Sequence, residues 1–359
     1  MEENNSNHIR LIAFYLGQFH PIPENNAWHG EGFTEWTNVG KAKPLFKGHY
    51  QPKVPADLGY YDLRLEEVRV KQAEMAKQHG IEGFCYWHYW FGNGKRLLEK
   101  PINEVIASGK PDFPFCFAWA NDSWKGIWHG LSKGNMLIEQ LYPGDQDIED
   151  HFYAVLDAFK DKRYIRIDDK PVFMIYKALD LPDANKFIKT WQGLALKNGL
   201  KGVYFIGQAV HLHEVEKLEK LDLDSINVVR LLYAEQQLSN KYSRFAKRLL
   251  KLPRFAKYKN AMKYFIGKEE ESPNMIPTII PNWDHSPRSG TNALILHDAK
   301  PEFFDSHVKS VFEVLKKKSP DRRIAFVKSW NEWAEGNYLE PDLRYGKQYL
   351  EVLKENLNS

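Results

Sequence analysis

The sequence contains no long apolar run. No stretch approaches the roughly 18 consecutive apolar residues that a membrane-spanning helix needs, and residues 1–7 are polar and acidic. A secretory signal peptide would instead begin with a basic segment followed by an apolar one. We therefore expect a soluble, cytoplasmic protein.

Cysteine is nearly absent. The chain has two, Cys85 and Cys116, and each lies within an apolar run. Two such thiols exclude a disulfide-stapled fold, and we expect both to be buried and reduced. His20, His88 and His285 belong to no HxH or HxxxH pair, so hydrogen bonding is their expected role. We expect neither a metal nor a cofactor.

The chain also lacks a large net charge of either sign. The formal net charge is only +3, which argues against a general nucleic-acid binder. The first predicted strand leads into residues 15–18, Tyr-Leu-Gly-Gln, and not into the Gly-rich turn of a dinucleotide-binding fold. No DxD motif stands at the end of a predicted strand, as a sugar-nucleotide transferase would require.

Aromatic side chains are in excess, at 14% of the residues, with 11 Trp and 18 Tyr. Trp and Tyr combine a large apolar surface with a polar atom, so they suit surfaces that are half open to water. A sugar matches such a surface, because its ring faces are apolar and its edges carry hydroxyls. Nucleic acids also stack on aromatic rings, but their phosphates need several cations.

Apolar runs alternate with amphipathic segments along the chain. The predicted strands are 9–16, 81–86, 113–119, 171–176, 203–208, 225–231, 275–280 and 324–329. The predicted helices are 63–79, 97–107, 147–160, 183–197, 214–220, 302–317 and 342–356. Eight strands that alternate with helices pair in parallel and close into a barrel. We predict an α/β fold with a single (β/α)8 TIM-barrel domain over residues 1–359 and extended loops after its strands.

One segment, at about 236–270, departs from this pattern. Between residues 241 and 268 it has ten Lys or Arg and no acidic residue, interleaved with aromatic and aliphatic side chains. We predict a basic amphipathic helical insertion. A solvated basic face is the simpler interpretation, and peripheral contact with a membrane or an anionic glycan is the alternative.

Polar and aromatic residues gather after the predicted strands, where the active site of a barrel enzyme lies. The opposite ends of the strands carry ordinary Gly, Pro, Lys and Asp. From this asymmetry we predict one large cleft that binds an oligosaccharide or polysaccharide. The predicted substrate-binding residues are Tyr15, Gln18, His20, Glu35, Trp36, Tyr50, Gln51, Trp87, Tyr89, Trp119, Asn121, Tyr176, Gln208, Asn282, Trp283, Asp284, Arg288, Trp330, Asn331, Trp333 and Tyr338.

The eighth predicted strand leads into residues 330–336, Trp-Asn-Glu-Trp-Ala-Glu-Gly. Cleavage of a glycosidic bond needs a proton donor and a second carboxylate, and we predict Glu332 and Glu335 as this catalytic pair. Three residues apart on a helical turn, they would project to the same side, and their proximity would separate their pKa values. Alternatively, Glu335 would be a first-turn acid at a helix N-terminus.

These residues, together with Glu340-Pro341, resemble the N-E-W-x-E-G…E-P signature of glycoside hydrolase family 99 and its WbsX-like relatives. Residues 13–36, 50–52, 83–90 and 119–121 resemble the WbsX branch more closely. The resemblance spans nearly the whole chain and implies a (β/α)8 barrel that acts on glycans. The hydrolase branch includes endo-acting α-mannosidases, and the WbsX branch, from bacterial O-antigen and capsule gene clusters, is often labelled glycosyltransferase.

The resemblance also implies roles for the two acids. Glu335 would be the general acid, and Glu332 would act as a base on the sugar 2-hydroxyl, giving retention through an anhydro-sugar intermediate. Ala334 stands where the hydrolases commonly carry His, a departure that affects mannose specificity but not the carboxylate pair. Glu35 and Trp36 belong to the WbsX pattern, so the resemblance to the hydrolases implies no role for them.

Three functions are compatible with the sequence. A retaining glycosidase or trans-glycosidase that acts on bacterial surface polysaccharide (O-antigen or capsule) or its precursors is favoured. A WbsX-type glycosyltransferase of lipopolysaccharide and O-antigen biosynthesis is the alternative, and the missing phosphate loop and DxD motif count against it. A non-catalytic glycan-binding barrel is the third. The oligomeric state does not follow from the sequence.

Overall fold

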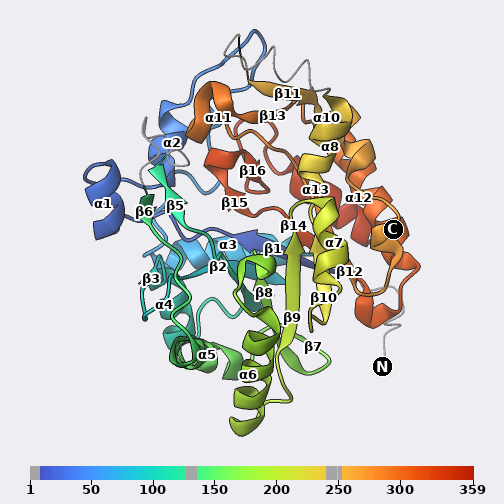
Figure 1. The fold of residues 1–359 in the computed structure, drawn as a ribbon. Helices are drawn as coiled ribbons and strands as arrows, with labels where there is room; N and C mark the ends of the chain where they lie inside the picture. Colours follow the sequence, from blue (N-terminus) through green and yellow to red (C-terminus); the bar gives the residue numbers. More distant parts are fainter. Residues whose placement is uncertain (1–8, 127–135, 240–248, 250–252) are drawn as a thin grey trace.

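The computed structural model describes residues 9–126, 136–239, 249 and 253–359. Eight parallel strands close into a barrel, in the order β1, β14, β12, β10, β9, β8, β4, β2 and back to β1 (Figure 1). Their bounds are β1 (Arg10–Tyr15), β2 (Gly83–Trp90), β4 (Phe115–Trp119), β8 (Lys170–Ile175), β9 (Tyr204–Ala209), β10 (Ser225–Val228), β12 (Met275–Ile279) and β14 (Ile324–Val327). All eight predicted strands are present, and the predicted (β/α)8 barrel is confirmed.

The strands are buried on both faces, which explains their continuous apolar sequences. Residues 172–175 of β8, for example, have no exposed surface. The first strand closes the ring, because Ile12 is in register with Phe326 of β14 on one side and with Gly83 of β2 on the other. A Cβ at Gly83 would lie 2.4 Å from the carbonyl oxygen of Pro114, so this position in the wall needs a glycine.

Helices surround the barrel. They are α3 (Glu66–Gln78), α4 (Lys100–Ser108), α5 (Asp145–Lys160), α6 (Ala184–Lys197), α7 (Val215–Leu218), α8 (Leu231–Leu238), α12 (Pro301–Lys316) and α13 (Gln348–Leu357). Three of them, α3, α4 and α13, begin three or more residues later than predicted. Helix α4 follows β3 (Arg96–Leu97), which pairs with the end of β2, and α13 follows a turn in which the Asp342 carboxylate accepts two backbone N–H groups. None of the helices in the described residues is long and apolar enough to cross a membrane.

Shorter elements make up the extended loops. They are α1 (Pro23–His29), α2 (Glu35–Lys41), β5 (Trp124–Lys125), β6 (Met136–Ile138), β7 (Arg166–Ile167), α10 (Tyr258–Ala261), α11 (Ser286–Ser289), β13 (Leu294–His297), β15 (Asn331–Glu332) and β16 (Asn337–Tyr338). Figure 1 shows α2, α11, β15 and β16 grouped at one end of the barrel, with β7 toward the other. Loops from the first, seventh and eighth barrel strands therefore meet at one end.

The predicted helical insertion falls partly outside the described residues, which omit 240–248 and 250–252. The helical prediction is wrong for β11 (Arg254–Lys257), which pairs in parallel with β13. The side chains of β11 alternate between half-buried and exposed, because successive residues of a strand point to opposite faces. Tyr258 and Phe265, which follow β11, are buried in a small core beside the barrel.

We predict that Glu270→Ala destabilises the fold. Glu270 is fully buried, and its carboxylate accepts hydrogen bonds from Arg230 Nε at 2.6 Å and Nη2 at 2.8 Å. Its removal leaves the charge of Arg230, which is 4% exposed, with the half-exposed Glu269 as its remaining ion-pair partner among the described residues. Urea unfolding should show a loss of about 3 kcal/mol. Glu271→Ala, at the exposed neighbouring position, should cost less than about 0.5 kcal/mol, and equal losses would contradict the prediction.

Candidate functional site

A small hairpin follows β14 at the open end of the barrel. It consists of β15, the 3-10 turn η9 (Trp333–Glu335) and β16. Gly336 closes the turn at a φ of +60°, and a Cβ there would lie 2.7 Å from Asp284, so only glycine fits. The Ser329 hydroxyl accepts the N–H of Glu332 at 3.0 Å and donates to Asn337. The two acids of the motif therefore sit on a well-anchored turn.

Two other motif residues anchor this hairpin. The Asn331 amide donates to the carbonyl oxygen of Leu16 at 3.1 Å and accepts its N–H at 2.8 Å, which ties the hairpin to the end of β1. Behind the hairpin, the Glu340 carboxylate accepts hydrogen bonds from three neutral groups, those of Trp333, Tyr61 and Gln72, at 2.6 to 2.9 Å. Asn331 and Glu340 thus position the turn.

Glu332 contacts the carboxyl-terminal half of β2. Its Oε1 accepts a hydrogen bond from the indole N–H of Trp87 at 2.5 Å. Burial raises the pKa of Glu332, the Lys328 ammonium opposes this rise, and Glu335 adds to it. A carboxylate that holds a proton more tightly than usual is a stronger base. Glu332 is therefore suited to abstract a proton from a ligand.

Lys328 is a residue of this site that the sequence prediction missed. It follows β14 directly, is half-buried, and its ammonium lies 5.3 Å from the ring centre of Trp87, 5.7 Å from that of Trp283 and 5.5 Å from that of Phe14. Aromatic faces attract a cation but accept no conventional hydrogen bond from it. Within the described ranges the ammonium has no hydrogen-bond or ion-pair partner, so its N–H groups can donate to a ligand.

Arg288 joins two carboxylates. Its Nη1 donates to Glu335 Oε1 at 2.5 Å, and its Nη2 donates to Glu35 Oε1 at 2.7 Å. The same oxygen of Glu35 accepts the N–H of Ala334 at 3.1 Å. The Glu35 side chain is 1% exposed and that of Glu335 is 17% exposed. Of this pair, Glu335 is therefore the one that a ligand can reach.

The N-termini of two helices position Glu35 and Arg288. Helix α2 begins at Glu35 after Thr34, which forms a capping box, and α11 begins at Ser286, whose N–H donates to Asp284 Oδ1 at 3.0 Å. Such caps satisfy the N–H groups that a first helical turn leaves unpaired. They bring Glu35 from the first loop and Arg288 from the seventh to the same side of η9.

Burial and neighbouring charges shift the pKa values of Glu35 and Arg288 in opposite directions. Burial raises the pKa of Glu35, and Arg288 opposes that rise. Burial lowers the pKa of Arg288, but Glu35 and Glu335 outweigh it and hold this pKa above its ordinary value. Burial, together with Arg288, lowers the pKa of His285 to about 3. His285 is therefore neutral at physiological pH, and Arg288 supplies the positive charge beside Glu335.

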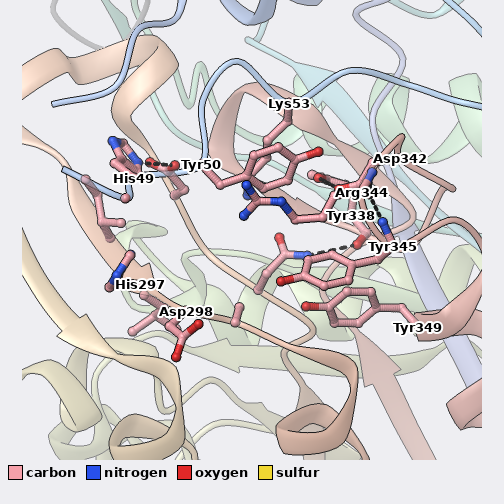
Figure 2. Close-up of a pocket in the computed structure, with 16 residues that line it drawn as sticks. His49, Tyr50, Lys53, His297, Asp298, Tyr338, Asp342, Arg344, Tyr345 and Tyr349 are labelled. Atoms are coloured by element: carbon pink, nitrogen blue, oxygen red, sulfur yellow. Dashed lines mark hydrogen bonds and ion pairs between the residues drawn. The ribbon is translucent and has the colours of Figure 1, made fainter. Parts of the chain in front are cut away.

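A second group of predicted residues lines a cavity beside the hairpin (Figure 2). Tyr50, Asn282, Asp284 and Tyr338 are among the residues around this space of about 60 Å³. Gln51 belongs to the same region, because its amide donates to Asp284 at 2.6 Å. The lining includes neither of the two acids of the motif. Some of the predicted substrate-binding residues therefore lie at the carboxylates, and others lie at this separate cavity.

Other predicted residues take part in packing. Tyr15 donates to Gln72 of α3 at 2.7 Å, and Trp119 donates to the carbonyl oxygen of Trp90 at 3.0 Å and stacks on Phe187 of α6. Five more predicted residues take part in packing, because each is hydrogen-bonded within the core or buried in it: Trp36, Asn121, Gln208, Trp330 and Trp333. The sequence could not separate these residues from ligand contacts, because outward-facing side chains of a covered strand are as apolar as inward-facing ones.

The remaining predicted residues lie close to the first strand or to the carboxylates. Gln18 and His20 are buried, and each has an Nε2 atom without a partner among the described residues. Burial, followed by the charge of Glu332, raises the pKa of Tyr89. The ring of Tyr176 meets that of Trp87 edge-on at 5.8 Å. Tyr89 and Tyr176 therefore belong to the surroundings of Glu332.

No group of three His, Cys, Asp or Glu among the described residues is placed to hold a metal ion. His88 and His151 form a buried pair, with their Nε2 atoms 2.8 Å apart, and Cys85 and Cys116 are buried free thiols. These groups are parts of the core.

We predict that Glu340 makes stability depend on pH. Burial raises the pKa of this carboxyl to about 7 from 4.5, against hydrogen bonds that lower it. Because the folded protein holds the proton more tightly than the unfolded chain does, stability falls as pH rises from about 4.5 to about 7, by up to roughly 3 kcal/mol. Unfolding at several pH values should show this slope, and Glu340→Gln should remove it. Glu355→Gln, at an exposed position of α13, should retain it, and an unchanged slope in Glu340→Gln would refute the prediction.

We also predict a large effect of Arg288→Met. The substitution leaves the Glu35 carboxylate buried without its cation, which should cost about 3–5 kcal/mol of unfolding free energy. The double variant with Glu35→Gln should recover much of the loss, because a neutral amide can still accept the N–H of Ala334. Denaturant unfolding of the single and double variants measures this coupling. Simple additivity of the two substitutions would argue against the bridge.

Comparisons with known proteins agree on the fold. The chain superimposes on a family 99 endo-α-mannosidase from Bacteroides thetaiotaomicron, in complex with bis-tris propane, with a TM-score of 0.60 at 15% identity over 99% of this chain and 97% of the other. It also matches a glycoside hydrolase-like protein with a TM-score of 0.61 at 17% identity, over 99% and 95% of the two chains. At such low identities these likenesses show the fold alone.

Sequence comparisons give the family. A protein named "uncharacterized protein WxcX" from Xanthomonas campestris pv. campestris is 36% identical over 353 residues, which are 97% of this chain and 49% of the relative. The chain thus spans about half the length of the curated relatives it matches. The model of the family described as "Glycosyltransferase WbsX" matches residues 11–353. The chain therefore belongs to the WbsX family of carbohydrate-active proteins.

Proposed function

We propose that the protein is a retaining glycosidase or trans-glycosidase that acts on a bacterial surface polysaccharide or its precursor. The observation that carries this proposal is the placement of Glu332 and Glu335 on one anchored turn, each with a different partner. Glu332 accepts from a neutral indole, and Glu335 accepts from a guanidinium. Acid–base catalysis at a glycosidic bond needs two carboxyl groups in unlike surroundings.

In the proposed mechanism, Glu332 takes the proton of the sugar 2-hydroxyl, and that oxygen attacks the anomeric carbon. Glu335, which must be protonated when the substrate is bound, donates its proton to the leaving oxygen. Water, or another sugar hydroxyl, then opens the anhydro sugar with the proton transfers reversed, which returns the original anomeric configuration. The half-buried Trp87 and Trp283, whose ring centres lie 5.3 and 5.7 Å from the Lys328 ammonium, offer faces on which a sugar ring can stack.

The surroundings of Ala334 bear on specificity. Its side chain is fully buried, and its N–H donates to Glu35. The carboxylate of Glu35 and the guanidinium of Arg288 therefore lie beside the turn at the position where the related hydrolases commonly carry His. We infer that the sugar accepted here differs from the mannose of those hydrolases.

Transfer from a sugar nucleotide is a second candidate, which the description of the family supports. The two candidates differ in their donor. Incubation with capsular or O-antigen glycans, with and without sugar nucleotides and divalent metal, separates them. Turnover without a nucleotide supports the glycosidase, turnover only with a nucleotide supports the transferase, and binding without any turnover supports a glycan-binding barrel.

We predict that Glu335→Gln lowers turnover by about 10²–10⁴-fold, the usual contribution of a general acid, while glycan binding remains. Glu332→Gln should cause a loss of similar size. Glu31→Gln, the same chemical change at an exposed position of the first loop, is the matched control and should behave as wild type. Wild-type turnover in Glu335→Gln would disprove the assignment of the acid.

A further inference from the structure

The cavity beside the hairpin is a candidate binding site separate from the carboxylates. Its walls come from the first loop at residues 48–53, from the loop after β12 and from the turn at residues 342–345. Figure 2 shows Tyr50 and Arg344 together, with Tyr345 and Tyr349 on one side and His297 and Asp298 on the other. It adjoins the carboxylate site, because Lys53, which lines it, lies 3.4 Å from the carbonyl oxygen of Gly336.

Lys53 supplies hydrogen-bond donors to this cavity. The residue is 7% exposed, and its ammonium has one long hydrogen bond, to Gly336, and a contact at 5.1 Å with the ring of Tyr338. Burial lowers the pKa of Lys53, although Asp284 and Asp342 oppose this change. An ammonium carries three N–H donors, so Lys53 has capacity left for an acceptor in the cavity.

Asn282 supplies an acceptor. The residue is 5% exposed, its Nδ2 donates to the carbonyl oxygen of Tyr338 at 3.3 Å, and its Oδ1 has no partner among the described residues. The bond to a carbonyl oxygen fixes which end of the amide is the nitrogen. A buried acceptor without a partner costs free energy that a donor from a ligand would recover.

The two buried carboxylates of the cavity are already satisfied. Asp284 accepts from His49, Gln51 and the backbone of Ser286 at 2.6 to 3.0 Å. Asp342 accepts from Tyr338 and two backbone N–H groups at 2.7 to 2.9 Å. Their charges are matched by those of Lys53 and Arg344, and the third lining carboxylate, Asp298, whose side chain is 45% exposed, pairs with Lys300 at 3.7 Å. A ligand that enters this space should therefore be uncharged.

We propose that this cavity binds the acetamido group of an N-acetylated amino sugar. The acetamido oxygen accepts from the Lys53 ammonium, its N–H donates to Asn282 Oδ1, and its methyl group packs against the tyrosine rings. The cavity of about 60 Å³ has room for about four water-sized atoms, and an acetamido group has four non-hydrogen atoms. The inference rests on the proposed carbohydrate function and names the class of sugar.

Matched ligands test the proposal without turnover. N-acetylglucosamine and N-acetylgalactosamine are compared with glucose and galactose, by calorimetry and by saturation transfer to the acetyl methyl protons. Two hydrogen bonds, one from a charged donor, should make at least one acetamido sugar bind about tenfold or more tightly than its parent. Its N-propionyl analogue, with one more methylene, should bind more weakly. Equal binding of each N-acetyl sugar and its parent would overturn the proposal.

Variants locate the binding. Lys53→Met should abolish the preference for the acetamido sugar, and Lys47→Met, the same change at an exposed position of the first loop, should preserve it. If Lys53→Met does not fold, the comparison of the N-acetyl and N-propionyl sugars on the wild-type protein still tests whether the cavity holds the acetamido group. Acetamido binding in a protein that cleaves no glycan would contradict the glycosidase proposal alone. Glycan cleavage without acetamido preference would contradict this inference alone.

Discussion

Closure of the barrel between its first and last strands is the constraint on which the rest of the structure depends. β1 pairs with β2 on one edge and with β14 on the other, so loops that are distant in sequence meet at one rim. The side chain of Asn331 extends this closure past the last strand by bonding both backbone groups of Leu16. Without that fixed edge, Glu332 and Glu335 would have no defined place relative to Trp87 or Arg288.

The fold could be predicted from the sequence because buried parallel strands are apolar on both faces, as residues 172–175 show. The location of Glu332 and Glu335 at the open end of the barrel could be predicted because both acids follow the last apolar strand within a few residues. Which aromatic residues contact the site could not be predicted, since Trp119 and Trp87 both lie in the carboxyl-terminal half of barrel strands, yet one packs under α6 and the other contacts Glu332. That difference depends on strand orientation, which a single sequence does not record.

Two lysines, one beside the carboxylates and one in the cavity, were also difficult to predict. Lys328 and Lys53 are ordinary lysines in sequence, and only the rings of Trp87 and Trp283 around the first, and the burial of the second, distinguish them. The available signal was weak: a lysine at the end of the apolar run before the motif. The β11 strand was missed for a related reason, because its alternating pattern is short and lies within a longer basic segment.

The burial of Arg288 has a consequence for the conditions under which the site keeps its shape. Mobile ions screen charges at the surface over about 10 Å at 0.1 M salt, but they screen buried pairs much less. The Arg288 side chain is 11% exposed and that of Glu35 is 1% exposed, whereas pairs such as Lys201 with Asp169 are 72% exposed on both sides. Rising ionic strength should therefore weaken the surface pairs first, while the geometry around Glu335 stays constant.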